Sequence, residues 1–232
     1  MTEPLFRDDA YRRDCAATVV ASGEATIVLD RTVFYPLGGG QPGDTGRIEW
    51  QGGSVDIADT RYGNGTIHPL VAEDASLPPV GTAVTAKIDW DRRYRHMRMH
   101  TGLHLLGSVL KFGVTGGNIG AAKSRLDFDM QDPVDKDAVT QALQALVAAD
   151  HPVGTSWITD EELEAQPDLV RTMSVQPPKG VGRVRLLEIE GVDLQPCGGT
   201  HLKSTREVGG IRVSKVEKKG RHNRRVSIVL DD

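Results

Sequence analysis

The sequence predicts an α+β protein that begins with a strand-rich region and continues with alternating helices and strands. From about residue 16 to 89, short apolar segments are separated by Gly, Asp, Asn and Pro. Several short strands at this spacing favour a small barrel or sandwich. From residue 90 onward, longer segments with helical spacing alternate with short apolar ones. We therefore expect a small β-barrel-like domain at residues 1–89 and an α+β domain at residues 90–232.

Residues typical of turns and helix ends set the limits of each expected element. The strands expected in the first region lie at 17–22, 25–29, 46–50, 54–59, 66–70 and 83–88. A helix should begin at a cap, Asp89 or Asp91, and end near Phe112 because Gly113 follows. A flexible glycine-rich segment is expected at 114–123. Beyond it we expect helices at 136–149 and 160–165, and strands at 126–130, 153–158, 183–189, 210–216 and 225–230.

Composition excludes several classes of protein. The 232 residues carry 28 Lys and Arg against 32 Asp and Glu, a net charge of −4, so any contact with nucleic acid must come from a local patch. Two cysteines, Cys15 and Cys197, do not suggest a disulfide framework and fit a reducing compartment. No apolar leader or long uncharged run is present, so we expect a soluble, cytoplasmic protein without a membrane segment. We also expect no ATP site, because no phosphate-binding loop motif occurs.

Two short motifs carry four side chains that can bind a metal ion. His100 and His104 are spaced by four, which places both imidazoles on one face of the expected helix. Cys197 and His201 have the same spacing in a Gly-Gly segment that should bend as a loop. One Cys and three His suit Zn²⁺ better than Mg²⁺ or Ca²⁺. Either pair alone is a weak signal, but together they predict one Zn²⁺ per chain.

A third motif is the glycine-rich segment Gly38-Gly39-Gly40-Gln41. Three consecutive glycines remove every Cβ, so a ligand or another backbone can approach closely. A tight hairpin loop is an equal alternative.

These three motifs occur together, and in the same order, in a known family. The segments around Pro36-Leu-Gly-Gly-Gly-Gln-Pro-Gly-Asp44, His100-Thr-Gly-Leu-His104 and Pro196-Cys-Gly-Gly-Thr-His201 resemble the free-standing alanyl-tRNA editing proteins of the AlaX type, in particular their longer class. Those proteins are related to the editing domain of alanyl-tRNA synthetase. The resemblance implies that residues 90–232 form an editing domain with a zinc site, and that residues 38–41 lie near the aminoacyl pocket and bind substrate.

The resemblance further implies a hydrolase that deacylates mischarged tRNA. Its expected partner is the acceptor end of tRNA(Ala) carrying serine or glycine. The residues expected to act through the metal are His100, His104, Cys197 and His201. Asp193 could orient a histidine, act as a proton acceptor or be an ordinary turn residue, so we give it no catalytic role.

Two alternatives remain open. One is editing of Ser-tRNA(Thr), because that editing domain has a similar core. The other is a non-catalytic, zinc-stabilised module that only binds tRNA, since four protein ligands describe a closed structural site. The C-terminal part is rich in basic residues between Lys203 and Arg225. It could bind the acceptor stem through phosphate contacts or simply confer solubility.

Overall fold

The computed structural model describes residues 2–23, 25–63, 66–71, 76–173, 177, 180 and 182–231. The chain mixes helices and strands in two compact units, Met1–Arg95 and His96–Asp232. Helix α1 (Trp90–Leu110) begins in the first unit and ends in the second. In the described part of the chain, no helix combines the length and apolar character that crossing a membrane requires.

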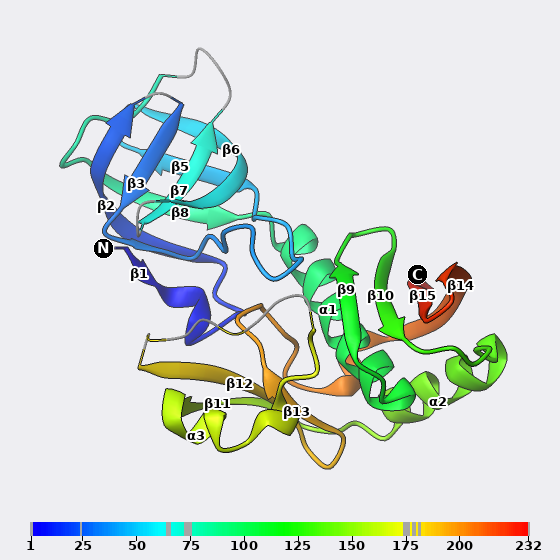
Figure 1. Cartoon of the computed structure of the whole chain (residues 1–232). Coiled ribbons are helices and arrows are strands. Elements are labelled where there is room, and N and C mark those ends of the chain that lie inside the picture. The colour runs from blue at the N-terminus through cyan, green and yellow to red at the C-terminus, as the bar shows by residue number, and fades with distance from the viewer. Residues whose placement is uncertain are drawn as a thin grey trace. The chain divides into compact units, whose positions relative to one another are not determined.

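The first unit is built on a closed six-stranded barrel, drawn from blue to cyan-green in Figure 1. Around the barrel the strands follow the order β2-β3-β7-β6-β5-β8. Their bounds are β2 (Asp14–Gly23), β3 (Thr26–Leu29), β5 (Gly46–Trp50), β6 (Gly53–Gly63), β7 (Thr66–Val71) and β8 (Ala83–Ile88). Closure of the sheet removes its free edges, which confirms the predicted barrel.

Alternating side chains fill the interior of the barrel. Strand β2 buries Cys15, Ala17 and Val19, and strand β8 buries Val84 and Ala86, each at every second position. Two short strands, β1 (Glu3–Pro4) and β4 (Arg31–Thr32), pair in parallel, and a 3₁₀ turn at Leu5–Arg7 follows β1.

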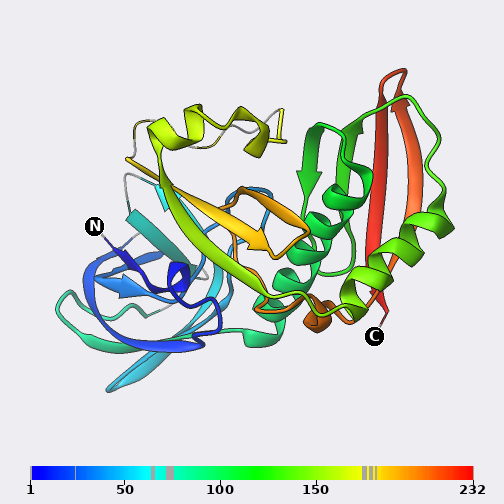
Figure 2. The ribbon, with the colours of Figure 1, turned by 90° about the horizontal axis from the view of Figure 1, so that it is seen from below.

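The described part of the second unit contains two sheets and four helical segments in addition to the end of α1. The four-stranded sheet has the order β14-β15-β10-β9, and the three-stranded sheet has the order β11-β12-β13. Helix α2 packs against β14, as Figure 2 shows. The bounds are β9 (Val114–Asn118), β10 (Ser124–Asp129), α2 (Lys136–Ala148), β11 (Val153–Thr159), α3 (Asp160–Glu164), η2 (Pro167–Leu169), β12 (Arg183–Ile189), β13 (Asp193–Pro196), η3 (Thr205–Val208), β14 (Gly210–Gly220) and β15 (Asn223–Asp231).

Helix α1 begins as predicted, because the Asp89 carboxylate accepts a hydrogen bond of 3.1 Å from the Arg92 backbone N–H. Its part in the second unit, from His96 onward, has no single apolar face: the residues buried there include Met97, Met99, Leu105 and Leu106. A helix buried on all sides belongs to the centre of a unit rather than its surface.

In this part of the chain one expectation was wrong, and one of the alternatives left open for Asp193 is excluded. The glycine-rich segment after α1 is not simply flexible: Val114–Asn118 pairs with β10 as strand β9. The segment after β12 contains a further strand, β13, so Asp193 is a buried strand residue rather than a turn residue. In both cases pairing with a neighbouring strand outweighs the local sequence preference.

Candidate metal centre

Helix α1 carries the first two potential ligands. His100 and His104 lie one turn apart, and both are buried, with 7 % and 8 % of their surfaces exposed. Their ring centroids are 5.3 Å apart, as expected for positions i and i+4 on one helix face.

The loop after β13 carries the other two potential ligands, and a buried arginine holds it in place. The Cys197 backbone N–H donates to the Arg185 carbonyl at 3.0 Å, which extends the pairing of β12 and β13 by one residue. The Arg185 guanidinium, which is 9 % exposed, donates to the carbonyls of Cys197 and Gly199 at 3.0 and 2.9 Å. Arg185 therefore fixes the start of the Gly-Gly bend, a role that its position in the sequence did not reveal.

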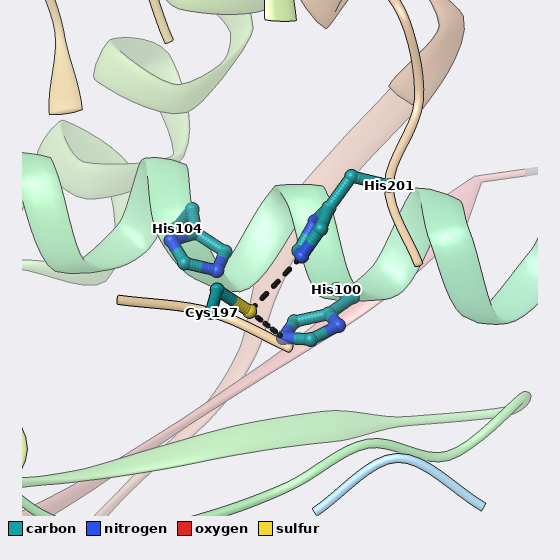
Figure 3. Close-up of side chains that lie close together, drawn as sticks. All are labelled: His100, His104, Cys197 and His201. Carbon is teal, nitrogen blue, oxygen red and sulfur yellow. Dashed lines mark hydrogen bonds between the residues drawn. The ribbon is translucent and has the colours of Figure 1, made fainter. Parts of the chain in front are cut away.

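The two motifs meet, as Figure 3 shows. The possible ligand atoms of His100, His104, Cys197 and His201 all lie within 4.8 Å of one another. Cys197 Sγ is 3.5 Å from His100 Nε2 and 3.1 Å from His201 Nε2. Zinc bonds of 2.0–2.3 Å in a tetrahedron separate ligand atoms by about 3.3–3.8 Å. The buried donor set therefore suits a soft divalent ion, and the predicted convergence of these four side chains on one possible metal site is confirmed.

Asp193 lies directly behind one of these histidines. Its Oδ2 is 3.0 Å from His104 Nδ1, and its Oδ1 is 3.1 Å from the Arg171 guanidinium. Gln195 donates a hydrogen bond of 2.6 Å to the same carboxylate. A carboxylate on Nδ1 fixes the imidazole with its proton on that nitrogen, leaving Nε2 as the ligand atom. Asp193 is therefore placed to orient His104, which was one of the alternatives left open for it.

The charges in the cluster favour the metal-binding forms of Cys197 and His201 but not that of His104. Burial raises the pKa of the Cys197 thiol, but the positive charge of His100 and its hydrogen bond outweigh this and hold that pKa well below its usual value. Burial and the charge of His100 lower the pKa of His201 to about 3. Burial opposes the charged form of His104, but Asp193 and Cys197 raise its pKa to about 9. A thiolate and a neutral imidazole are thus ready as ligands, whereas His104 must release a proton when a metal binds.

The glycine-rich loop lies in the first unit, where its polar residues are enclosed. Gln41 is fully buried, and its backbone exchanges hydrogen bonds of 3.1 and 2.9 Å with Gly38. Asp44 accepts 3.0 and 3.1 Å hydrogen bonds from Arg93 Nε, and both side chains are buried. Arg93 also donates to the carbonyls of Ala10 and Val33. The role of Gly38–Gln41 in binding substrate stays a prediction, whereas Arg93 is a buried structural residue of the first unit.

The basic C-terminal region is less positive in three dimensions than along the chain. Carboxylates from distant segments reach it, so that Arg206 pairs with Asp150, Arg212 with Asp231, and Arg225 with Asp127. Glu217 pairs with both Lys215 and Lys219. A tRNA-binding surface would have to rely on the basic residues outside these pairs.

Two family models match the chain. One, described as tRNA synthetases class II (A), matches residues 9–92, and the other, described as the threonyl and alanyl tRNA synthetase second additional domain, matches residues 184–227. The second match includes Cys197 and His201.

Known relatives resemble the chain over nearly its whole length. An alanyl-tRNA editing protein AlaX-M from Methanosarcina acetivorans is 37 % identical over 100 % of both chains. An AlaX-L protein from Pyrococcus horikoshii is 34 % identical over 96 % of this chain and 56 % of its own length. An alanine–tRNA ligase from Pyrobaculum arsenaticum is 36 % identical over 94 % of this chain and 25 % of its own length. The chain therefore belongs to the family of AlaX alanyl-tRNA editing proteins.

Proposed function

We propose that this protein hydrolyses the ester that joins a wrong amino acid to the 3′ end of tRNA(Ala). The substrate we expect is Ser-tRNA(Ala), with Gly-tRNA(Ala) as a second candidate. The observation that carries the proposal is the cluster of four possible ligand atoms within 4.8 Å, three of them on buried histidines, in a chain whose relatives are named as alanyl-tRNA editing proteins. We place this activity in the cytoplasm and assign the metal chemistry to residues 90–232.

The four side chains His100, His104, Cys197 and His201 would hold one Zn²⁺. When bound, Zn²⁺ supplies a Lewis acid that polarises an ester carbonyl and lowers the pKa of water toward about 7. The chain's own residues prepare the site: Asp193 holds the His104 ring by Nδ1, and Arg185 holds the carbonyls of the loop that carries Cys197. Burial of all these groups strengthens the electrostatic interactions between them.

Such an activity is needed because alanine is difficult to distinguish from glycine and serine. A pocket built for alanine cannot strongly reject the smaller glycine, or serine with its added hydroxyl. We assign selection to the predicted substrate-binding residues Gly38, Gly39, Gly40 and Gln41. The Gln41 amide offers a donor and an acceptor for a serine hydroxyl, and it is already removed from bulk water.

A second candidate function is a zinc-stabilised module that binds tRNA without turnover. Four protein donors around one point favour it, because structural zinc sites are closed whereas catalytic ones keep a position open. Editing of Ser-tRNA(Thr) is the other enzyme activity to be compared.

Deacylation assays separate these candidates. Purified protein is mixed with Ser-tRNA(Ala), Gly-tRNA(Ala) and Ser-tRNA(Thr), each with and without a chelator. We expect release of serine from the first, and loss of that release on chelation or in His104→Ala. The exposed His222 lies outside the cluster, so His222→Ala is the matched control and should keep full activity.

Each other outcome has a clear meaning. Binding of tRNA without release of the amino acid would replace the hydrolase proposal with the binding module. Faster release from Ser-tRNA(Thr) than from Ser-tRNA(Ala) would transfer the proposal to the threonine system.

A further inference from the structure

The three-stranded sheet of the second unit aligns three side chains in one row. Trp157 on β11 is directly opposite Arg185 on β12, and the hydrogen bond from Cys197 N–H to the Arg185 carbonyl continues the row beyond β13. Cross-strand neighbours in register project from the same face of a sheet. Trp157, Arg185 and Cys197 therefore share one face. Two strand spacings separate the Cα atoms of Trp157 and Cys197, about 10 Å.

This face is the one that looks toward the candidate metal centre. Asp193 and Gln195 alternate with Leu194 and Pro196 along β13, so they project from the same side as Cys197. Asp193 contacts His104, and Cys197 contacts His100, which shows that both ends of this strand face helix α1.

Trp157 is open to solvent at the outer end of the row. It is 46 % exposed, whereas Arg185 in the middle is 9 % exposed. A tryptophan that served only the core would bury most of its large apolar surface. Arg183, two residues before Arg185 on β12, projects from the same face and is also exposed. An exposed aromatic ring beside an exposed guanidinium suits a nucleotide, because the ring stacks on a base and the cation pairs with a phosphate.

We propose that Trp157 and Arg183 bind the last nucleotide of the tRNA: the Trp157 ring stacks on the unpaired terminal base, and Arg183 pairs with the phosphate before it. This inference rests on the proposed function, in which the ester at the terminal ribose lies at the metal centre. The Cα atoms of Trp157 and Cys197 are about 10 Å apart, a spacing that lets the base of one nucleotide lie at Trp157 while the ester on its ribose lies near the metal centre. Proteins recognise single-stranded RNA ends by such stacking.

A binding experiment tests the stacking without using hydrolysis. The chain contains three tryptophans, so Trp50→Phe with Trp90→Phe leaves Trp157 as the only indole fluorophore in the full chain. The probe is an RNA hairpin that reproduces an acceptor stem with its unpaired 3′ end, and the control hairpin lacks the terminal nucleotide. We expect the complete hairpin to quench the emission of Trp157 and the shortened one to leave it unchanged. Equal emission with both hairpins would overturn the proposal.

Substitution of Trp157 provides a second, independent test. Trp157→Ala should weaken binding of the complete hairpin about 5- to 150-fold, the loss typical for removing one stacked aromatic ring. Binding of the shortened hairpin should stay unchanged, and Trp157→Phe should restore most of the difference. A merely structural role would weaken both hairpins alike and would overturn the proposal. Phe112→Ala, which removes another exposed aromatic ring of the same unit, is the matched control.

Assays on the same proteins test this inference and the proposed function separately. If the wild-type chain releases no amino acid from any of the three charged tRNAs, the hydrolase proposal fails, while the hairpin titrations still decide the role of Trp157. If the wild-type chain is active and Trp157→Ala binds both hairpins with wild-type affinity, the hydrolase proposal survives and the stacking proposal fails.

Discussion

The metal cluster and the glycine-rich loop both bury polar side chains close to glycines, yet they are organised in opposite ways. In the cluster, four donor atoms converge within 4.8 Å, and the outer contacts of Asp193 and Arg185 leave those donors facing one another. In the loop, Asp44 is neutralised by Arg93, whose other hydrogen-bond donors bind backbone carbonyls. The donor atoms of the cluster converge on a point where a cation could bind. The Asp44 carboxylate is instead already paired with the Arg93 guanidinium.

Because of this difference, substitutions in the metal cluster and substitutions in the Arg93–Asp44 pair should have different effects. Removing one donor from the cluster deletes a ligand and, without a metal, relieves the crowding of polar groups. Removing one partner of the Arg93–Asp44 pair leaves an uncompensated buried charge, which is strongly destabilising. Variants of the cluster should therefore lose metal binding and keep their fold, and variants of the pair should lose stability.

The largest effect is expected for Cys197→Ala. Loss of a residue that only hydrogen-bonds to a metal ligand typically lowers metal affinity roughly 10- to 100-fold. Loss of the thiolate ligand itself should lower zinc affinity by more than that, and deacylation should fall with it. Isothermal titration with Zn²⁺ measures the affinity, and circular dichroism checks that the fold persists. The other cysteine provides the control: Cys15 lies in the barrel core, so Cys15→Ala should keep its metal. Equal zinc affinity in the wild-type chain and Cys197→Ala would remove Cys197 from the ligand set.

The next effect in size is expected for Arg93→Ala. It leaves the Asp44 carboxylate buried without its cation, so we expect a loss of about 3–5 kcal/mol in the free energy of unfolding. Denaturant titration followed by circular dichroism measures this change. Arg47 forms an ion pair with Asp56 on the exposed surface of the same barrel, so Arg47→Ala should leave the denaturation midpoint unchanged. An equally small shift for Arg93→Ala would show that the buried pair contributes no more than a surface one.

From the sequence alone, we could predict the features that depend on short-range patterns of residues. The i, i+4 spacing placed His100 and His104 on one face, and the residues typical of turns limited β5, β8 and β12 to the predicted ranges. The family motifs predicted that the second pair of ligands would meet the first.

Interactions between distant residues could not be predicted in the same way. Arg93 follows Asp44 by 49 positions, and in the sequence it is one of several arginines at the start of a helix. Asp193 and His104 are 89 positions apart, so their contact depends on the pairing of β13 with β12 and on how α1 packs. Strand β9 was missed because its glycines have low strand propensity, and its hydrogen bonds come from distant residues, on β10 and, at Val114, from Arg171 and Met173.

A smaller effect is expected for Asp193→Asn, which keeps the shape of the side chain but removes the charge behind His104. Since outer partners orient metal-bound histidines and make them more basic, zinc affinity should fall about 10- to 100-fold. The pKa of His104, about 9 when Asp193 is present, should fall toward its ordinary value. Zinc binding near neutral pH should then release fewer protons. Isothermal titration with Zn²⁺ in buffers of different ionisation enthalpy measures the number of protons released. Proton release equal to that of the wild-type chain would show that Asp193 does not control His104.

The smallest effect, and the one that most directly tests the loop, comes from two adjacent glycines. Gly39 has φ +56°, so Gly39→Ala forces an L-residue into the left-handed region and should cost about 1 kcal/mol of unfolding free energy. Gly38 does not have a positive φ, and a Cβ there would meet the Tyr35 hydroxyl at an ordinary 3.6 Å. Gly38→Ala should therefore be neutral or slightly stabilising, because it restricts the unfolded chain.

Deacylation by these two variants then distinguishes a hairpin loop from a substrate-binding loop. If Gly38 only shapes the backbone, Gly38→Ala keeps both its stability and its rate with Ser-tRNA(Ala). If a substrate approaches the loop closely, the added methyl group raises KM in a chain whose denaturation midpoint is unchanged. A raised KM at constant stability is the result we expect, since we assign residues 38–41 to substrate binding. An unchanged KM would mean that this glycine, like the neighbouring Arg93–Asp44 pair, serves the fold of the barrel unit rather than the substrate.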